Sequence, residues 1–145
     1  MKKISFLIFL FIASTAVNAQ LKTTLTDSLA QKFGEAWNEN NLDKMISLIQ
    51  PDAFFKSPYQ MNYSRDTMAA TVLITNPSII RNTKTIELYS KVDDNIAWSI
   101  GKLSGSIFDE KGNDTGKKLS ADYIYVFTKK KNEGWKIQMI IVHEK

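Results

Sequence analysis

The sequence of 145 residues has no cysteine, a single histidine, six glycines and three prolines. Without cysteine there is no disulfide framework. A metal site would have to be built almost wholly from carboxylates, and no acidic run has the spacing of a calcium-binding loop. The sequence also lacks the Gly-x-Ser-x-Gly turn of many hydrolases and the glycine-rich loop that holds phosphates. We therefore expect neither a metal nor a cofactor.

The N-terminus has the three-part pattern of a cleavable export signal. Lys2 and Lys3 precede an almost wholly apolar stretch up to Ala13, and small residues then lead to Ala19. The apolar stretch is too short to cross a bilayer, which takes about 20 residues. We expect residues 1–19 to be a signal peptide and the mature protein, periplasmic or secreted, to begin at Gln20 without membrane attachment.

The mature chain of residues 20–145 has the length of one domain. The full sequence has 19 basic and 15 acidic residues, and loss of the two N-terminal lysines leaves 17 against 15. A net charge of about +2 is too small to indicate nucleic-acid binding. Within this domain we find no repeat, linker or low-complexity tract.

The first half of the domain has the apolar spacing of helices. Large apolar residues at every fourth position across 25–37 predict a first helix. A second helix is expected from Asn41, a good N-terminal cap, to Pro51, which disfavours helical geometry before it. A third is expected from Ser64 to Pro77.

The second half has the alternating pattern of strands separated by short polar turns. After a short strand at 53–55 and a loop at 57–63, we expect four long strands, at residues 83–92, 96–108, 118–129 and 135–143. Short connections favour an antiparallel meander. Helices followed by such a sheet indicate an α+β fold in which the helices cover one face.

Three stretches resemble a known family. They are FGEAWNENNLDKMISLIQPD at 33–52, DNIAWSIGKLSG at 94–105 and DYIYVFTKKKNEGWKIQMIIV at 122–142. The last is similar to a closing pair of long strands around a Gly-Trp-Lys-Ile turn. In this order and spacing they resemble the SnoaL-like branch of the nuclear transport factor 2-like superfamily, which includes many exported proteins.

The resemblance implies a cone, in which a strongly curved antiparallel sheet and N-terminal helices enclose a cavity. The family contains isomerases, cyclases, dehydratases, epoxide hydrolases and binding modules, so the fold alone does not decide the function. Two departures weaken the transfer of a catalytic role. The last strand has Gln138-Met139-Ile140 where relatives often have a histidine, and no glycine lies near Ser64.

If the cone forms, aromatic side chains from separate segments should line its cavity. We expect the pocket between the first helix, the loop at 57–63 and the inner faces of the last two strands. Apolar walls would supply affinity, and hydroxyl and imidazole groups would orient the ligand. The expected ligand-binding residues are Trp37, Phe55, Tyr63, Tyr125 and His143.

His143 is the one histidine and shares a two-residue period with Trp135, Ile137, Met139 and Ile141. If that apolar face points inward, His143 could act as a general base, because histidine is the side chain that ordinarily changes charge near neutral pH. Its position close to the chain end, where strands often fray, favours a surface or rim residue over a catalytic one.

Three functions remain open. The first is binding of a small, mostly apolar molecule, and the second is acid–base catalysis in the same cavity, of the isomerase, dehydratase or hydrolase type. The third is a non-catalytic dimerisation or interaction domain. No paired titratable groups are visible in the sequence, which favours binding. We also expect a homodimer through the outer sheet face, because Trp98 alternates away from Ala97 and Ser99.

Overall fold

The computed structural model describes residues 24–145, so the expected signal peptide at 1–19 lies outside the described residues. The helical segments are α2 (Leu25–Asn38), α3 (Leu42–Ser47), α4 (Arg65–Met68), the π-helical turn η1 (Ala69–Leu73) and α5 (Ile74–Ile79). The strands are β1 (Ile49–Lys56), β2 (Met61–Asn62), β3 (Ile80–Val92), β4 (Ile96–Phe108), β5 (Asp114–Lys130) and β6 (Gly134–Glu144).

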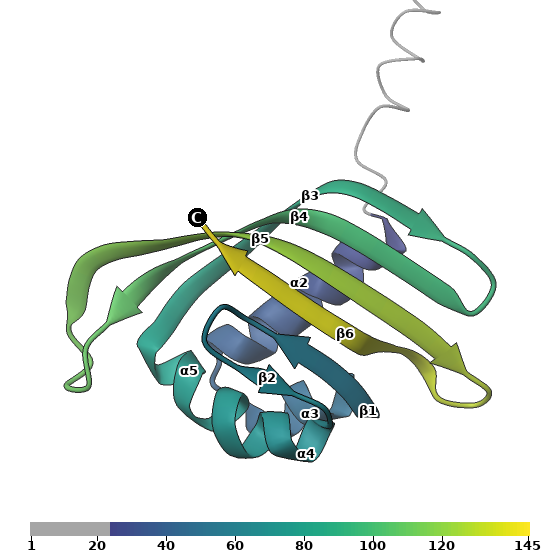
Figure 1. Cartoon of the computed structure of the whole chain (residues 1–145), viewed down its shortest axis with the longest axis horizontal. Helices are drawn as coiled ribbons and strands as arrows, with labels where there is room; N and C mark the ends of the chain where they lie inside the picture. Colours follow the sequence, from purple (N-terminus) through teal and green to yellow (C-terminus); the bar gives the residue numbers. More distant parts are fainter. Residues whose placement is uncertain (1–23) are drawn as a thin grey trace, which may run out of the picture.

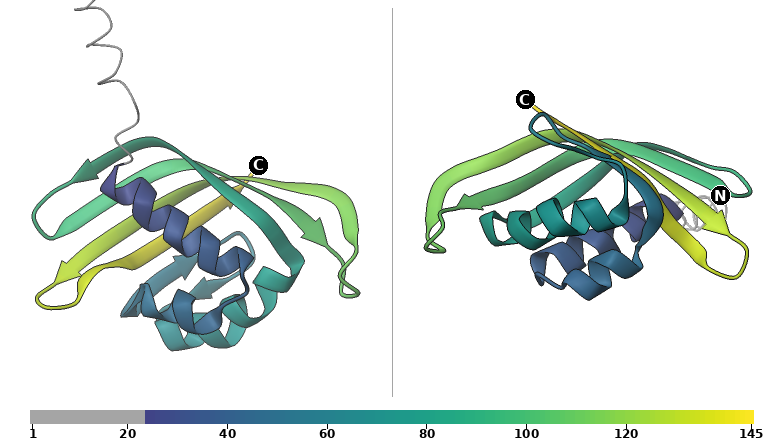
Figure 2. Two further views of the ribbon diagram at one scale, coloured as in Figure 1. Left: turned by 180° about the vertical axis from the view of Figure 1, so that it is seen from behind. Right: turned by 60° about the horizontal axis from the view of Figure 1, so that its bottom comes forward.

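The strands form one curved sheet of six, in the order β2-β1-β6-β5-β4-β3. The helices lie against its concave face, and the sheet bends around them without closing (Figures 1 and 2). The expected α+β cone is therefore present. The sheet is mixed rather than wholly antiparallel, because β1 pairs in parallel with β6. Strand β1 is also longer than the strand expected at residues 53–55. The four-strand meander β3–β6 is antiparallel throughout.

Helices α3 and α4 begin directly after the N-terminal caps expected from the sequence, Asn41 and Ser64. Asn41 Oδ1 accepts from the Lys44 N–H at 3.0 Å, and Ser64 Oγ accepts from the Thr67 N–H at 3.2 Å. The expected end of the third helix at Pro77 is wrong, since α5 continues to Ile79. The π-helical turn η1 interrupts the regular backbone pattern just before Pro77, so the missing N–H of proline falls where the helix is already irregular.

Helix α2 is fastened to β3 at both ends. The Glu87 carboxylate accepts from the hydroxyls of Thr24 at 2.7 Å and Thr26 at 2.6 Å. At the other end, Asn38 Oδ1 accepts from the Thr83 N–H at 2.8 Å, and Asn38 Nδ2 donates to the Thr83 carbonyl at 3.0 Å. These contacts fix the face that α2 presents to the concave side of the sheet.

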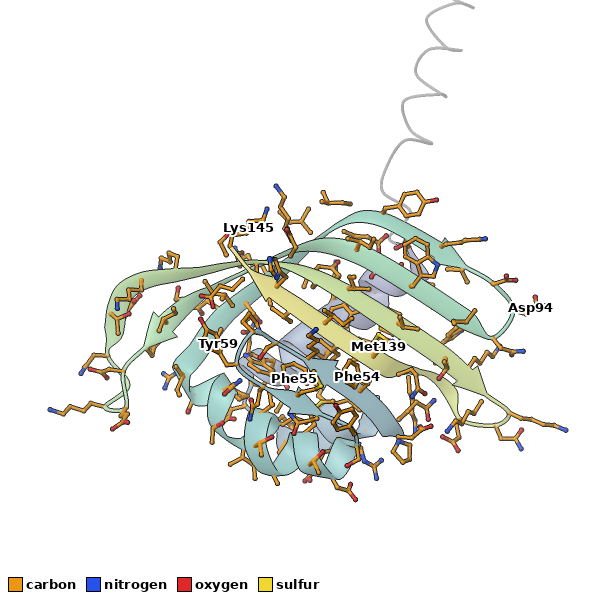
Figure 3. The ribbon with its side chains drawn as sticks, in the orientation of Figure 1. Phe54, Phe55, Tyr59, Asp94, Met139 and Lys145 are labelled. Atoms are coloured by element: carbon orange, nitrogen blue, oxygen red, sulfur yellow. The ribbon has the colours of Figure 1, made fainter. Side chains whose placement is uncertain are left out.

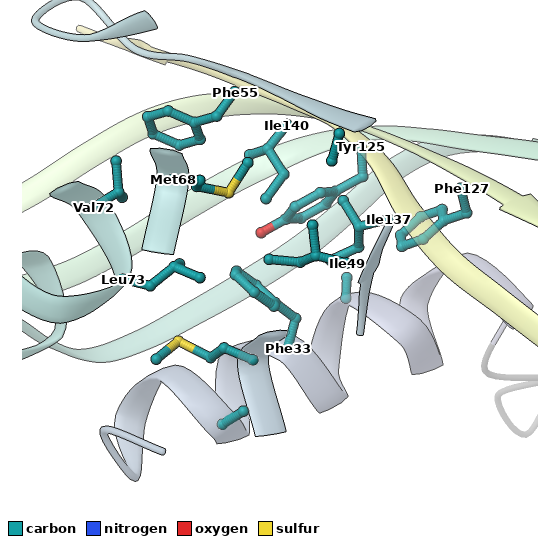
Figure 4. Packing of buried hydrophobic residues seen from close by; sticks show 14 of the residues in the cluster. Phe33, Ile49, Phe55, Met68, Val72, Leu73, Tyr125, Phe127, Ile137 and Ile140 are labelled. Atoms are coloured by element: carbon teal, nitrogen blue, oxygen red, sulfur yellow. The ribbon is translucent and has the colours of Figure 1, made fainter. Parts of the chain in front are cut away.

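The core fills the space between the helices and the concave face. Alternate residues of β5 point inward, and Tyr123, Tyr125 and Phe127 are all buried. They meet Phe33 from α2, Ile49 from β1 and Met68 from the third helical segment (Figure 4). Only the concave side of β5 faces the helices, so burial alternates along the strand.

Candidate functional site

A cavity of about 400 Å³ lies between the concave face and the helical layer. It is bounded by α2, the α4–α5 segment, the β1–β2 turn and the inner faces of β3 to β6. Most of the wall is apolar, as is usual for a small-molecule site. The buried residues of the wall are Phe33, Phe55, Met68, Val72, Leu73, Leu119, Tyr125 and Ile140.

The rim of the cavity is polar. Gln31, Glu35 and Asn38 reach it from α2, and Lys84 from β3; all four are exposed. Thus a bound molecule would have an apolar interior around it and mixed charges at the opening.

Trp37 forms part of the wall because its indole is held in place by β3. Its Nε1–H donates to the carbonyl of Ile80 at 2.8 Å, and its ring lies 6.2 Å from that of Phe33. The side chain is only partly buried, since one side of it borders the cavity. Trp37, one of the expected ligand-binding residues, does line the cavity.

Tyr125 is the buried wall residue with a polar side-chain group. Only 5% of the residue is exposed, and within residues 24–145 its hydroxyl has no hydrogen-bond partner. Burial raises its pKa well above the ordinary value of a tyrosine, and the neighbouring Tyr123 adds to the effect. In Figure 4 its oxygen points between Phe33 and Met68. The group is therefore a neutral donor directed at the cavity.

Tyr123 provides a contrast on the same strand face. It is 1% exposed, and its hydroxyl also lacks a partner, but it does not line the cavity. Its ring leans over Gly101, where an added Cβ would lie 2.6 Å from the hydroxyl oxygen. Burial raises the pKa of Tyr123 to about 12. Only one of the two tyrosine hydroxyls therefore reaches the cavity.

The end of β1 and the turn that follows it carry aromatic residues near the cavity, among them Phe55 and Tyr59 (Figure 3). Phe55 is 7% exposed and lines the cavity. Tyr63 does not line it: this residue is 72% exposed, and its ring stacks outside on Phe54 at 5.6 Å. Tyr59 takes the rim position instead and donates from its hydroxyl to Glu144 Oε2 at 2.6 Å. The short β1–β2 turn puts Tyr59, rather than Tyr63, over the opening.

The expectation that His143 faces inward is wrong. Strand β6 has a bulge, since Val126 pairs with Met139 but Phe127 pairs with Ile137. The extra residue, Gln138, shifts the alternation by one position. After the bulge the concave face carries Ile140, Val142 and Glu144, which line the cavity. His143 is exposed on the outer side, in a shallow depression that it shares with Lys56 and Lys145.

Sequence reasoning missed the part of the cavity wall that comes from α4 and η1. Met68, Val72 and Leu73 are at most 1% exposed and border the cavity. The four-residue spacing of Met68 and Val72 after the Ser64 cap is an apolar stripe that could have indicated this. The structure thus brings together Trp37, Phe55 and Tyr125 with this stripe, and leaves Tyr63 and His143 outside.

Titratable groups are sparse inside the site. Among residues 24–145 no aspartate, glutamate or histidine is buried, and the cavity carboxylates Glu35 and Glu144 lie at its rim. In the same range no three His, Cys, Asp or Glu side chains lie close enough to hold a metal ion. None of the helices in this range is long and apolar enough to cross a membrane.

The convex face of the sheet carries many apolar side chains, and no element within residues 24–145 covers them. Two rows of large side chains run across the strands on this face, and we call them the convex rows. On the same face, Ile86, Tyr89 and Ile100 are 62%, 59% and 38% exposed. The rows are Phe54–Met139–Val126–Trp98 and Ile141–Ile124–Ile100–Tyr89. Trp98 does lie on the outside, where its ring packs on Tyr89 at 5.3 Å.

Comparison with solved structures places the fold among nuclear transport factor 2-like and ketosteroid isomerase-like proteins. A ketosteroid isomerase-like protein from Erwinia carotovora atroseptica matches with a TM-score of 0.72 at 11% identity, over 86% of this chain and 97% of its own. A nuclear transport factor 2-like superfamily protein from Salmonella enterica matches with a TM-score of 0.68 at 13% identity, over 79% and 84%.

A third match is a protein from Xanthomonas campestris named for the association domain of calcium/calmodulin-dependent protein kinase II. Its TM-score is 0.67 at 19% identity, over 81% of this chain and 84% of its own. No protein-family model and no curated protein matches the sequence. At these identities the likeness establishes the nuclear transport factor 2-like fold.

Proposed function

We propose that this protein is an exported binding domain that holds a small, mostly apolar molecule in the cavity between the sheet and the helices. The observation that carries the proposal is the wall itself. Its buried residues are apolar apart from one tyrosine hydroxyl, and they surround about 400 Å³. That volume and lining are typical of sites that take up small apolar ligands.

The structural neighbours support the same proposal. Proteins with this fold commonly bind small hydrophobic molecules or act on them as isomerases, and the Erwinia neighbour is described as ketosteroid isomerase-like. The likeness in fold does not by itself decide between binding and catalysis.

The positions of the ionisable groups favour binding over acid–base catalysis. A general acid or base inside an apolar pocket has a pKa displaced by burial and lies within reach of the ligand. In the described part of the chain, Glu35 and Glu144 are at the rim. Tyr125 is protonated near neutral pH, as tyrosines ordinarily are, and burial raises its pKa further, so it would donate a hydrogen bond rather than take up a proton.

The convex rows support the expected homodimer. An exposed apolar surface of this extent is characteristic of an interaction site, and pairing of two copies would cover it. We expect Ile100→Lys to shift the protein toward monomer in light scattering, because a charge would then lie in the centre of the interface. Lys102→Ala, on the same strand and face, is the control. A parent protein that is monomeric at high concentration would contradict the dimer.

Export from the cytoplasm is proposed from the N-terminal sequence pattern. N-terminal sequencing of protein recovered from the periplasm or medium should begin at Gln20. Recovery of protein that still begins at Met1 would contradict it.

The ligand-binding proposal is tested by extracting the purified protein with organic solvent and identifying the released molecules by mass spectrometry. Leu73→Trp places an indole in the cavity, because Leu73 is 1% exposed and borders it. Ile74→Trp is the matched control one position along, at a site that is 54% exposed and outside the wall. We expect a small apolar compound from the parent and from Ile74→Trp, and much less from Leu73→Trp. Equal recovery from all three would contradict the proposed site.

A further inference from the structure

We propose that the cavity selects a neutral, mostly apolar molecule with a hydrogen-bond acceptor at its inner end, such as a ketone, ester or ether oxygen, and that the Tyr125 hydroxyl donates to it. This inference rests on the proposed function and specifies its ligand class. It follows from the surroundings of one hydroxyl group.

Within residues 24–145, the Tyr125 hydroxyl makes no hydrogen bond to the protein. The ring lies edge-on to Phe33 at 6.3 Å and is flanked on its own strand by Tyr123 at 4.9 Å and Phe127 at 5.7 Å. These contacts fix the ring and so fix the direction of the O–H group. Ser99, which pairs with Tyr125 across β4 and β5, keeps its own hydroxyl unpartnered. The Tyr125 donor therefore remains available only to the contents of the cavity.

Unlike the hydroxyl of Tyr123, the Tyr125 hydroxyl is not fully enclosed by protein atoms, so it is open to the cavity and can donate to a molecule bound there. Tyr125 is 5% exposed; Phe33 of α2 and Met68 of α4 line the same cavity, and Ile140 is its partner on β6. None of these can accept a strong hydrogen bond from it. An acceptor atom on the ligand would satisfy the hydroxyl at the depth where apolar groups otherwise surround it.

The same surroundings argue against an inward-facing anion. No lysine, arginine or histidine is among the buried residues of the described chain, and Lys84 on the cavity lining is exposed at the rim. A carboxylate at the level of Tyr125 would lose its hydration with one hydroxyl in return, which is unfavourable. A neutral acceptor loses far less, so the geometry selects a neutral oxygen at the inner end.

Three naphthalene probes of nearly equal size separate these claims. We would titrate 2-acetylnaphthalene, 2-ethylnaphthalene and 2-naphthoate into the parent, Tyr125→Phe and Tyr123→Phe proteins by calorimetry. Tyr125→Phe removes the donor and keeps the ring. Tyr123→Phe removes a hydroxyl that is also buried and unpartnered but lies outside the cavity wall. Tyr123→Phe is therefore the matched control.

We expect Tyr125→Phe to weaken binding of the ketone by about fivefold to tenfold, the range for loss of one hydrogen bond between neutral groups. Its affinity for 2-ethylnaphthalene should be unchanged or slightly higher. Tyr123→Phe should bind all three probes as the parent does. The carbonyl stretching frequency of bound 2-acetylnaphthalene should be lower in the parent than in Tyr125→Phe, because a hydrogen bond weakens the C=O bond.

The possible failures are distinct. If 2-ethylnaphthalene binds the parent but Tyr125→Phe affects ketone and hydrocarbon equally, the assignment of the donor is overturned and the apolar site stands. If Tyr125→Phe weakens 2-naphthoate as it does the ketone, the restriction to neutral ligands is overturned. If neither the ketone nor the hydrocarbon binds the parent, the proposed function fails and the ligand class fails with it.

Discussion

The concave face of the sheet is filled at one end and hollow at the other. At the filled end, Phe127 of β5 pairs with Ala97 and Ile137 on its neighbouring strands and meets Ile49; all four are at most 2% exposed. Toward the other end the same strand carries Tyr125 and Leu119, which face the cavity. Tyr125 takes part in both, because its ring packs on Phe127 at 5.7 Å and it also lines the cavity.

The difference follows from where the helical layer reaches. Helix α3 and the start of β1 lie over the filled end. The long β4–β5 hairpin extends beyond the helices at the hollow end (Figure 1). Side chains there, including Leu103 and Leu119, have the cavity in place of a packed neighbour. One strand thus contributes both to stability and to the proposed binding site.

The largest expected effect is at the filled end. Phe127→Ala should lower the free energy of unfolding by about 3–5 kcal/mol, because it removes a fully buried aromatic ring that has no adjacent space to collapse into. Val126→Ala, on the convex face beside it, is the control and should cost far less. Urea denaturation measures both. If Phe127→Ala costs no more than Val126→Ala, the filled end is not the core.

Trp37→Ala should have an intermediate effect, with a loss of about 2 kcal/mol in the free energy of unfolding. The ring is partly buried and borders the cavity, so fewer packing contacts are lost than at Phe127. The substitution also removes the donor to the Ile80 carbonyl. A loss as large as that of Phe127→Ala, measured in the same urea series, would mean that Trp37 belongs to the packed core.

Alkaline pH should weaken the protein through the two buried tyrosines. Burial raises the pKa of Tyr123 to about 12 and that of Tyr125 further, against about 10 in the unfolded chain. Above pH 10 the unfolded state loses these protons first, so the free energy of unfolding falls as pH rises toward the folded values. Below pH 10 this contribution is fully present. The double variant Tyr123→Phe/Tyr125→Phe should show a shallower decline between pH 10 and 12, and an identical decline would contradict the burial of these hydroxyls.

The smallest expected effect is that of Tyr125→Phe at neutral pH. The substitution keeps the ring and removes a hydroxyl without a protein partner, so the free energy of unfolding should stay the same or rise by up to about 1 kcal/mol. Thermal or urea denaturation measures this. A clear destabilisation would indicate that the hydroxyl is bonded within the protein, which would remove the basis for assigning it to a ligand.

Local patterns in the sequence predict much of this fold. The caps at Asn41 and Ser64, the alternation along β5 and the outward position of Trp98 depend on neighbouring residues, and each is found in the structure. The parallel pairing of β1 with β6 could not be predicted in this way, because it joins residues far apart in the chain.

The candidate site was less accessible to sequence reasoning for the same reason. One bulge at Gln138 turns His143 outward and Glu144 inward. A strict two-residue alternation along the strand assumes that there is no bulge and therefore predicts the opposite faces for these two residues. The length of the β1–β2 turn likewise decides that Tyr59 rather than Tyr63 reaches the rim. Trp37, Phe55 and Tyr125 lie on the cavity wall, and their contact with a ligand stays a prediction.

The most direct test of a ligand site at the hollow end uses the protein's three tryptophans, whose indole N–H signals in a ¹⁵N correlation spectrum report on separate regions. Trp37 borders the cavity, Trp98 lies on the convex face and Trp135 is at the start of β6. Single Trp→Phe variants assign the signals. On titration with 2-ethylnaphthalene, the Trp37 signal should move and saturate while those of Trp98 and Trp135 stay in place. Movement of the Trp98 signal with a fixed Trp37 signal would contradict the account.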